Sequence, residues 1–169
     1  MGTAKELHDD LESMNPAEFG FTRRTWVDAT PDEVYRLVSD VSAISRWSPN
    51  ASDVAFDEGA GPVAGAWFSG RNTRNGKEWT TRSQVTKAEP GAEFAFVVGG
   101  AREGIVEWTW TFEAHDNGTL AAQSWRLLRL DPVLGRTRAD VEELRDYMAA
   151  SAESTLSSLA EWITATRSK

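Results

Sequence analysis

Hydrophobic and polar residues alternate from Ser52 onward for about 80 residues, a period of two that is typical of half-buried β-strands. Short glycine-containing turns separate the alternating runs, and short turns join antiparallel neighbours. The pattern therefore predicts a six-strand meander, with a further strand from Phe19 to Asp28 left to join one edge of the sheet. The meander strands are expected at residues 52–58, 65–74, 78–88, 92–98, 104–115 and 119–130.

Three further segments show the spacing of α-helices. The motif Thr30-Pro31-Asp32-Glu33 predicts a helix start, because its threonine and glutamate suit a capping box and its proline suits the first helical position. We expect an amphipathic helix of about three turns there, then a short helix from Val41 to Trp47 that ends before Pro49. Between residues 138 and 166, inward positions recur at steps of three and four, which predicts one long C-terminal helix. These positions are Val141, Leu144, Met148, Ala152, Thr155, Leu159 and Ile163.

The composition fits one globular domain, because 40% of the 169 residues are hydrophobic and no internal repeat divides the chain. We expect a polar N-terminal leader at residues 1–18 and a single α+β domain at residues 19–169. The net charge of −8 repels nucleic-acid backbones and anionic membrane surfaces. No run approaches the roughly 18–20 apolar residues of a membrane span, and the chain has no cysteine. We therefore expect a cytoplasmic protein with neither nucleic-acid binding nor membrane insertion.

Eight tryptophans are the most unusual feature of the composition. Trp108 and Trp110 alternate with polar residues in one predicted strand, so their rings share one face of the sheet. Each buried ring removes roughly 150–250 Å² from water, which is more than a small domain needs from one strand. That face is therefore either an aromatic core or the wall of a cavity for an apolar ligand. Further candidates for such a wall are Trp47, Phe68, Trp79, Thr81 and Phe96.

Three of the candidate residues have two open interpretations. Arg126 can stabilise an enolate if it points into a cavity, but Trp125 and Leu127 compete with it for the inner face, and alternation leaves its direction open. Tyr147 either supplies a phenol to the cavity or lies on the flank of the long helix. Trp47 either plugs the open end of the sheet or contacts the ligand.

Familiar catalytic and metal-binding arrangements are missing from the sequence. The two histidines, His8 and His115, cannot build a three-histidine zinc site. The glycine pairs lie between strands and do not open a helix, as a phosphate-binding loop must. We therefore expect no metal and no cofactor, and the catalytic residues, if any exist, stay unassigned.

Several segments together carry a resemblance to a known family. They are Val27-Asp28-Ala29-Thr30-Pro31-Asp32-Glu33-Val34-Tyr35, Asp40 with Trp47-Ser48-Pro49, Gly65-Ala66-Trp67-Phe68-Ser69-Gly70-Arg71-Asn72, Trp79, Glu89-Pro90-Gly91 with Phe94-Ala95-Phe96, and Thr155-Leu156 with Leu159. Over roughly residues 19–166 the chain resembles the START-like, Bet v 1-like (SRPBCC) superfamily, in its bacterial polyketide cyclase/dehydrase-like branch. The resemblance implies a helix-grip fold, in which an antiparallel sheet of about seven strands wraps around the long C-terminal helix. It also implies a hydrophobic cavity between the two, and small residues in the middle of that helix, Ala149 to Ser154, leave room for one.

The resemblance implies two main functions. The first is the binding or carrying of a small hydrophobic ligand, such as a lipid, a polyketide or an aromatic molecule, by a monomer or homodimer. The alternative is a polyketide cyclase, aromatase or dehydratase that acts on a bound chain without a metal and uses Arg126, Tyr147 or a Ser or Thr of the Trp79 strand for proton transfer. A third possibility is an interaction adaptor of the same fold whose cavity is closed.

Overall fold

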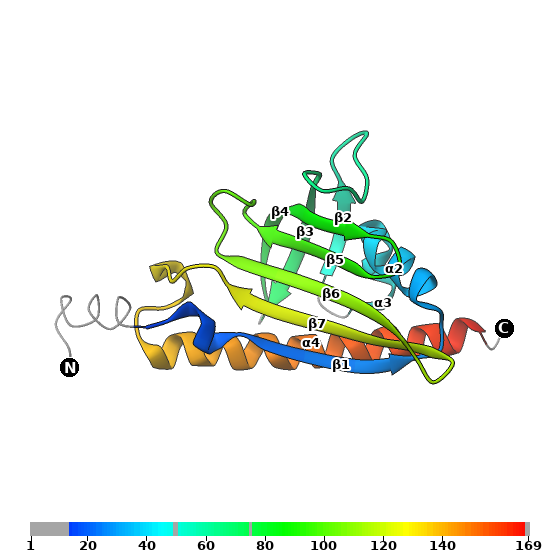
Figure 1. Ribbon diagram of the computed structural model, residues 1–169. Coiled ribbons are helices and arrows are strands. Elements are labelled where there is room, and N and C mark those ends of the chain that lie inside the picture. The colour runs from blue at the N-terminus through cyan, green and yellow to red at the C-terminus, as the bar shows by residue number, and fades with distance from the viewer. Residues whose placement is uncertain (1–13, 49–50, 75, 168–169) are drawn as a thin grey trace.

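The computed structural model describes residues 14–48, 51–74 and 76–167, and its elements form one antiparallel sheet, one long helix and several short helices (Figure 1). The strands are β1 (Phe21–Val27), β2 (Ala51–Phe56), β3 (Trp67–Arg74), β4 (Lys77–Glu89), β5 (Glu93–Val98), β6 (Val106–His115) and β7 (Gly118–Leu127). The helices are η1 (Pro16–Phe19), α2 (Pro31–Ser39), η2 (Val41–Ala43), α3 (Ile44–Trp47), η3 (Pro132–Leu134) and α4 (Arg138–Arg167).

The seven strands follow the order β1-β7-β6-β5-β4-β3-β2. β2 to β7 form the predicted meander, and β1 joins its edge by pairing antiparallel with β7, Val27 opposite Thr119. The sheet curves over α4, which runs alongside β1, while α2 and α3 lie at one end of the sheet (Figure 1). This arrangement confirms the expected α+β helix-grip fold.

Some boundaries differ from the sequence-based expectation for local reasons. The first strand begins at Phe21 because Asn15 caps η1, with its side-chain oxygen 3.0 Å from the Ala17 backbone nitrogen. The predicted helix over 41–47 is a 3-10 turn followed by one α-turn. The last strand ends at Leu127, three residues early. Of the expected leader, residues 1–13 lie outside the described residues, and Met14 is buried beside η1.

The capping box predicted for α2 is present. The Thr30 hydroxyl accepts from the Glu33 backbone N–H at 3.2 Å, and a Glu33 carboxylate oxygen accepts from the Thr30 N–H at 3.4 Å. Two otherwise unpaired N–H groups of the first turn are thereby satisfied, which stabilises the helix by about 1 kcal/mol. The buried face of α2 includes Tyr35, whose ring meets the rings of Phe94 and Phe112 edge to face. α2 therefore closes one end of the sheet with solid core.

The first turn of α4 is fixed by a reciprocal pair. The Thr137 hydroxyl accepts from the Asp140 backbone N–H at 3.2 Å, while the Asp140 carboxylate accepts from the N–H groups of Arg136 at 3.0 Å and Thr137 at 3.2 Å. These backbone N–H groups favour the ionised carboxylate and hold the pKa of Asp140 below its usual range.

Hydrophobic packing forms two clusters, one at each end of the sheet. The larger one lies under α2 and α3 and reaches the C-terminal half of α4, while the smaller one joins Met14 and Phe19 to Trp125, Leu127 and Val141. Between them, the buried residues in the middle of α4 are small, Ala149 and Ala152. No helix in the described part of the chain is long and apolar enough to cross a membrane.

Candidate ligand-binding site

A cavity of about 510 Å³ lies between the inner face of the sheet and α4. Its walls come from the inner faces of β2 to β7, from α2, α3 and η3, and from the part of α4 between Leu144 and Thr155. Ser151 and Thr155 are among the α4 residues that line it, and both have short side chains. The cavity therefore occupies the space that larger helix residues would fill.

Aromatic rings make up one continuous wall of the cavity. Cross-strand pairing sets them side by side, because Phe96 of β5 lies opposite Trp108 of β6. The Phe96 ring also meets the Phe68 ring of β3 edge to face at 5.1 Å between centroids. At the end near α3, the rings of Trp47 and Trp110 meet at 6.0 Å and 90°. Such a wall offers flat apolar surface to a ring-shaped or chain-shaped ligand.

Eight of the nine site residues selected from the sequence line this cavity. They are Trp47, Phe68, Trp79, Thr81, Phe96, Trp108, Trp110 and Tyr147. They come from six elements, α3, β3, β4, β5, β6 and α4, which the sheet topology brings together around one space. Their contact with a ligand stays a prediction.

Arg126, the ninth residue, is not among the residues that line the cavity. Its neighbours Trp125 and Leu127 are buried on the inner face, so Arg126 points to the outer face of β7. There its guanidinium donates to the Glu107 carboxylate at 2.6 Å, and its side chain is 62% exposed. The possibility that Arg126 stabilises an enolate inside the cavity is therefore dropped.

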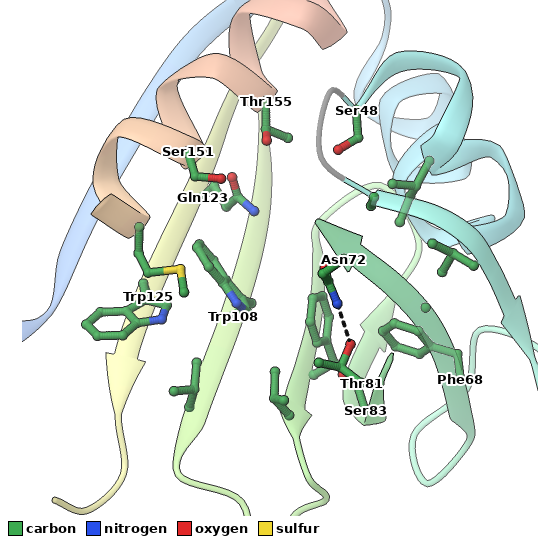
Figure 2. Close-up of a pocket in the computed structure, with 18 of the residues that line it drawn as sticks. Ser48, Phe68, Asn72, Thr81, Ser83, Trp108, Gln123, Trp125, Ser151 and Thr155 are labelled. Carbon is green, nitrogen blue, oxygen red and sulfur yellow. Dashed lines mark hydrogen bonds between the residues drawn. The ribbon is translucent and has the colours of Figure 1, made fainter. Parts of the chain in front are cut away.

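Several polar side chains that the sequence analysis did not select also line the cavity. They are Ser48, Asn72, Thr73, Ser83, Gln123, Ser151 and Thr155. Figure 2 shows two groups of them on opposite walls, one with Gln123 beside Ser151 and one with Asn72 bonded to Thr81. The Asn72 amide nitrogen donates to the Thr81 hydroxyl at 3.0 Å. A sequence signal existed for Gln123, because it shares the face of Ala121 and Trp125 in an otherwise apolar row.

Three buried polar atoms at the cavity have no hydrogen-bond partner among the described residues. They are Gln123 Oε1, Trp125 Nε1 and Trp47 Nε1. Gln123 is only 8% exposed, and all three residues line the cavity. A buried polar atom without a partner costs about 1–3 kcal/mol, so each of these atoms favours a partner supplied from inside the cavity.

The mouth of the cavity carries exposed apolar side chains. Val133 of η3 is 78% exposed and Trp79 of β4 is 44% exposed, although both line the cavity. η3 is held in place by Asp131, whose carboxylate accepts from the Val133 N–H at 3.0 Å and from Arg129 at 2.8 Å. These two bonds, the backbone one above all, hold the pKa of Asp131 below its usual range.

No Asp, Glu, Lys, Arg or His is found among the residues that line the cavity in the described part of the chain. The described residues also contain no group of three or more acidic or histidine side chains arranged to hold a metal ion. Hydrogen bonding inside the cavity therefore falls to neutral amide, hydroxyl, phenol and indole groups. Such a lining suits an uncharged apolar ligand with a few polar groups.

A family model described as polyketide cyclase / dehydrase and lipid transport matches residues 18–163 of the chain. The protein belongs to this family. Membership in the polyketide cyclase / dehydrase and lipid transport family confirms the resemblance stated from the sequence motifs, and the match covers the sheet and most of α4.

Several solved structures share this fold. The polyketide-cyclase-like protein Cgl2372 from Corynebacterium glutamicum has 30% sequence identity and a TM-score of 0.60, covering 86% of this chain and 91% of its own. The di-domain ARO/CYC StfQ of the steffimycin biosynthetic pathway has 17% identity and a TM-score of 0.72, covering 89% of this chain. This chain spans 52% of StfQ.

The fold extends to Ara h 8.0201, with 12% identity, a TM-score of 0.65, and coverage of 86% of this chain and 97% of that one. At such identity the likeness concerns the fold alone. No protein among the curated sequences matches this chain.

Proposed function

We propose that this protein binds and carries a small hydrophobic molecule of the lipid, polyketide or aromatic type in the cavity between the sheet and α4. The observation that carries the proposal is the aromatic-lined cavity of about 510 Å³, because ligand sites commonly measure roughly 300–1,000 Å³ and are mainly apolar. Membership in a family described by polyketide chemistry and lipid transport supports it. The third possibility, an adaptor with a closed interior, fits a cavity of this size poorly.

The aromatic lining supports an affinity in the micromolar range. A ligand that removes roughly 400–500 Å² of combined apolar surface from water gains about 10–12 kcal/mol. Association costs at least about 4 kcal/mol of that gain. At most about 6–8 kcal/mol then remains, which corresponds to dissociation constants of roughly 1–40 μM or weaker.

A matched pair of helix variants tests the proposal. Ser151→Phe places a ring inside the cavity, whereas Ser154→Phe places the same ring on the exposed side of α4. Pyrene, a long-chain fatty alcohol and a long-chain fatty acid are titrated while tryptophan fluorescence is followed. At least one probe should bind the natural protein saturably, lose about tenfold or more in affinity with Ser151→Phe, and keep its affinity within twofold with Ser154→Phe.

The proposal fails if no probe binds and native mass spectrometry of protein purified from its own host finds no bound small molecule. It also fails if the two phenylalanine variants weaken binding equally, because the ligand would then lie outside the cavity.

The enzymatic alternative, a cyclase, aromatase or dehydratase, draws support from the family and from Tyr147 at the cavity wall. Of the described lining residues, Tyr147 is the one with a phenol hydroxyl, so it is the candidate for proton transfer. Incubating the protein with a poly-β-ketone chain tests this role. Accelerated ring closure that Tyr147→Phe abolishes, with binding retained, would favour the enzyme over the carrier.

The proposal also includes a cytoplasmic site of action and a monomer or homodimer as the binding unit. Cell fractionation tests the first point. Sedimentation velocity with and without bound pyrene tests the second.

A further inference from the structure

The polar groups of the cavity differ in how well the protein itself satisfies them. On the wall made by β3 and β4, the Asn72 amide nitrogen already donates to the Thr81 hydroxyl at 3.0 Å (Figure 2). On the opposite wall, Gln123 extends from β7 toward α4, and its Oε1 atom has no partner among the described residues. Of the three unpartnered atoms at the cavity, Trp47 Nε1 and Trp125 Nε1 are donors, whereas Gln123 Oε1 is an acceptor.

Gln123 occupies a position where an apolar residue would ordinarily be expected. Its inward-facing neighbours on β7 are Ala121 and Trp125, both buried, and Gln123 itself is only 8% exposed. Ser151 of α4 lies beside its carboxamide in Figure 2, so the polar spot is built by two separate elements. An amide buried in such a row lowers stability unless something bonds to it, which points to a ligand group as its partner.

The kind of ligand group that can pair with Gln123 follows from the chemistry of its Oε1 atom. Oε1 is an acceptor, so it requires a hydroxyl or N–H donor. A carboxylate can accept from the unpartnered indole N–H groups of Trp47 and Trp125, but it offers no donor to Oε1, whereas a hydroxyl both donates and accepts. Moreover, no Lys, Arg or His is present among the lining residues in the described ranges to pair with a carboxylate, and burying an unpaired carboxylate is very unfavourable.

Resting on the proposed carrier function, we propose that Gln123 makes this cavity selective for uncharged ligands that carry a hydroxyl or N–H group, and that carboxylates such as fatty acids are rejected. The apolar rings supply affinity for any hydrophobic body. Gln123 determines which hydrophobic ligand binds most tightly, because an uncharged ligand with a donor group can bond to Gln123 Oε1. Gln123 is thus a specificity residue for the ligand.

Three probes with the same ring system test this selectivity: pyrene, 1-hydroxypyrene and pyrene-1-carboxylate. Binding is measured at pH 7 by energy transfer from tryptophan. We expect the natural protein to bind 1-hydroxypyrene about fivefold or more tightly than pyrene, and at least about tenfold more tightly than the carboxylate. Gln123→Met, which keeps the length of the side chain, should remove the hydroxyl preference while the affinity for pyrene stays within about twofold.

Arg126→Met is the matched control, since it places the same side chain on the outer face of the same strand and should change none of the three affinities. If Gln123→Met does not fold, the affinity ratios of the natural protein decide the matter alone. The inference is overturned if the carboxylate binds as tightly as the other probes, or if a folded Gln123→Met variant keeps the preference for 1-hydroxypyrene. In both cases the binding of pyrene would leave the carrier function intact. Failure of all three probes would overturn the selectivity, and the fatty-alcohol titration and native mass spectrometry described above would then decide the carrier function separately.

Discussion

Replacing Gln123 by glutamate would test whether the cavity is as apolar as its lining indicates. The substitution keeps the size of the side chain and adds a titratable group where the residue is 8% exposed, with no cationic residue among the described lining residues. Desolvation disfavours the charged form, so the pKa of the new carboxyl group should rise above its value in the unfolded chain.

The sign and size of the effect follow from that shift. Fully buried carboxyl groups shift upward by as much as about 3–5 pKa units, and a group at a cavity wall beside Ser151 should shift by about 2–3. Below about pH 4 the carboxyl group is protonated in both states and the shift costs nothing. As the pH rises, the unfolded chain ionises first, so stability is lost progressively until the folded-state pKa, near pH 7, is passed. The full loss is about 3–4 kcal/mol, because each unit corresponds to 1.36 kcal/mol.

Urea unfolding from pH 4 to pH 9 measures the loss. The free energy of unfolding of Gln123→Glu is compared at each pH with that of the natural protein and of Gln123→Met, which has the same shape and no charge to titrate. The reasoning is refuted if the deficit of the glutamate variant is the same at pH 4 and pH 9, or stays below about 1 kcal/mol throughout. Either result would mean that water solvates the carboxylate within the cavity.

Three further substitutions have expected outcomes. Arg126→Met, which breaks only the exposed pair with Glu107, should change the free energy of unfolding by about 0.5 kcal/mol or less in urea titrations; a loss above about 2 kcal/mol would contradict its outer position. Trp108→Ala should weaken pyrene binding about tenfold, yet reduce stability by less than the roughly 3–5 kcal/mol of a fully buried ring, because one side of Trp108 faces the cavity. Asp140→Asn should lower the melting temperature at neutral pH. Because the folded-state pKa of Asp140 is lowered, the difference in melting temperature between the variant and the natural protein should shrink as the pH falls through and below about 4. A difference that grows in acid would refute the capping role.

The order of elements could be predicted because its determinants are local. Alternation in the meander strands and the short turns between them specify antiparallel neighbours, and Thr30 and Glu33 cap α2 as their spacing requires. The edge that β1 joins could not be derived from local pattern, because its pairing with β7 joins residues about a hundred positions apart.

Irregular positions within strands explain why the alternating pattern alone could not assign every residue to a face of the sheet. In β4 the pairing with β5 shifts between Val85 and Lys87, so the strand does not continue the inward row of Thr81, Ser83 and Val85. Lys87 turns outward and its ammonium group lies 3.2 Å from the Glu93 carboxylate. Strict alternation from Val85 would place Lys87 on the inner face of the sheet. The position of a β-bulge must therefore be known before residues can be assigned to faces.

The candidate site was predicted as far as large rings define it. Trp108 and Trp110 stand out in the sequence because aromatic residues alternate with polar ones, and both line the cavity. The size of the space depends on how far α4 stands from the sheet, which only the packed tertiary structure sets. Gln123 was missed although it alternates with Ala121 and Trp125, because a polar residue in a strand is ordinarily taken to face solvent; the structure shows that it is buried.

The pairing of the first strand with the last has a consequence for how the chain folds. β1 leaves the ribosome early, but its hydrogen-bonding partner β7 begins only at Gly118, and α4, which packs along it, follows later still. Until then β1 has an open edge, and the apolar faces of the meander lack their cover. Closing so long a loop is slow because its entropy is lost before the contacts form. The cavity should therefore be the last part of the protein to appear, and molecules truncated before α4 should expose the aromatic wall and aggregate.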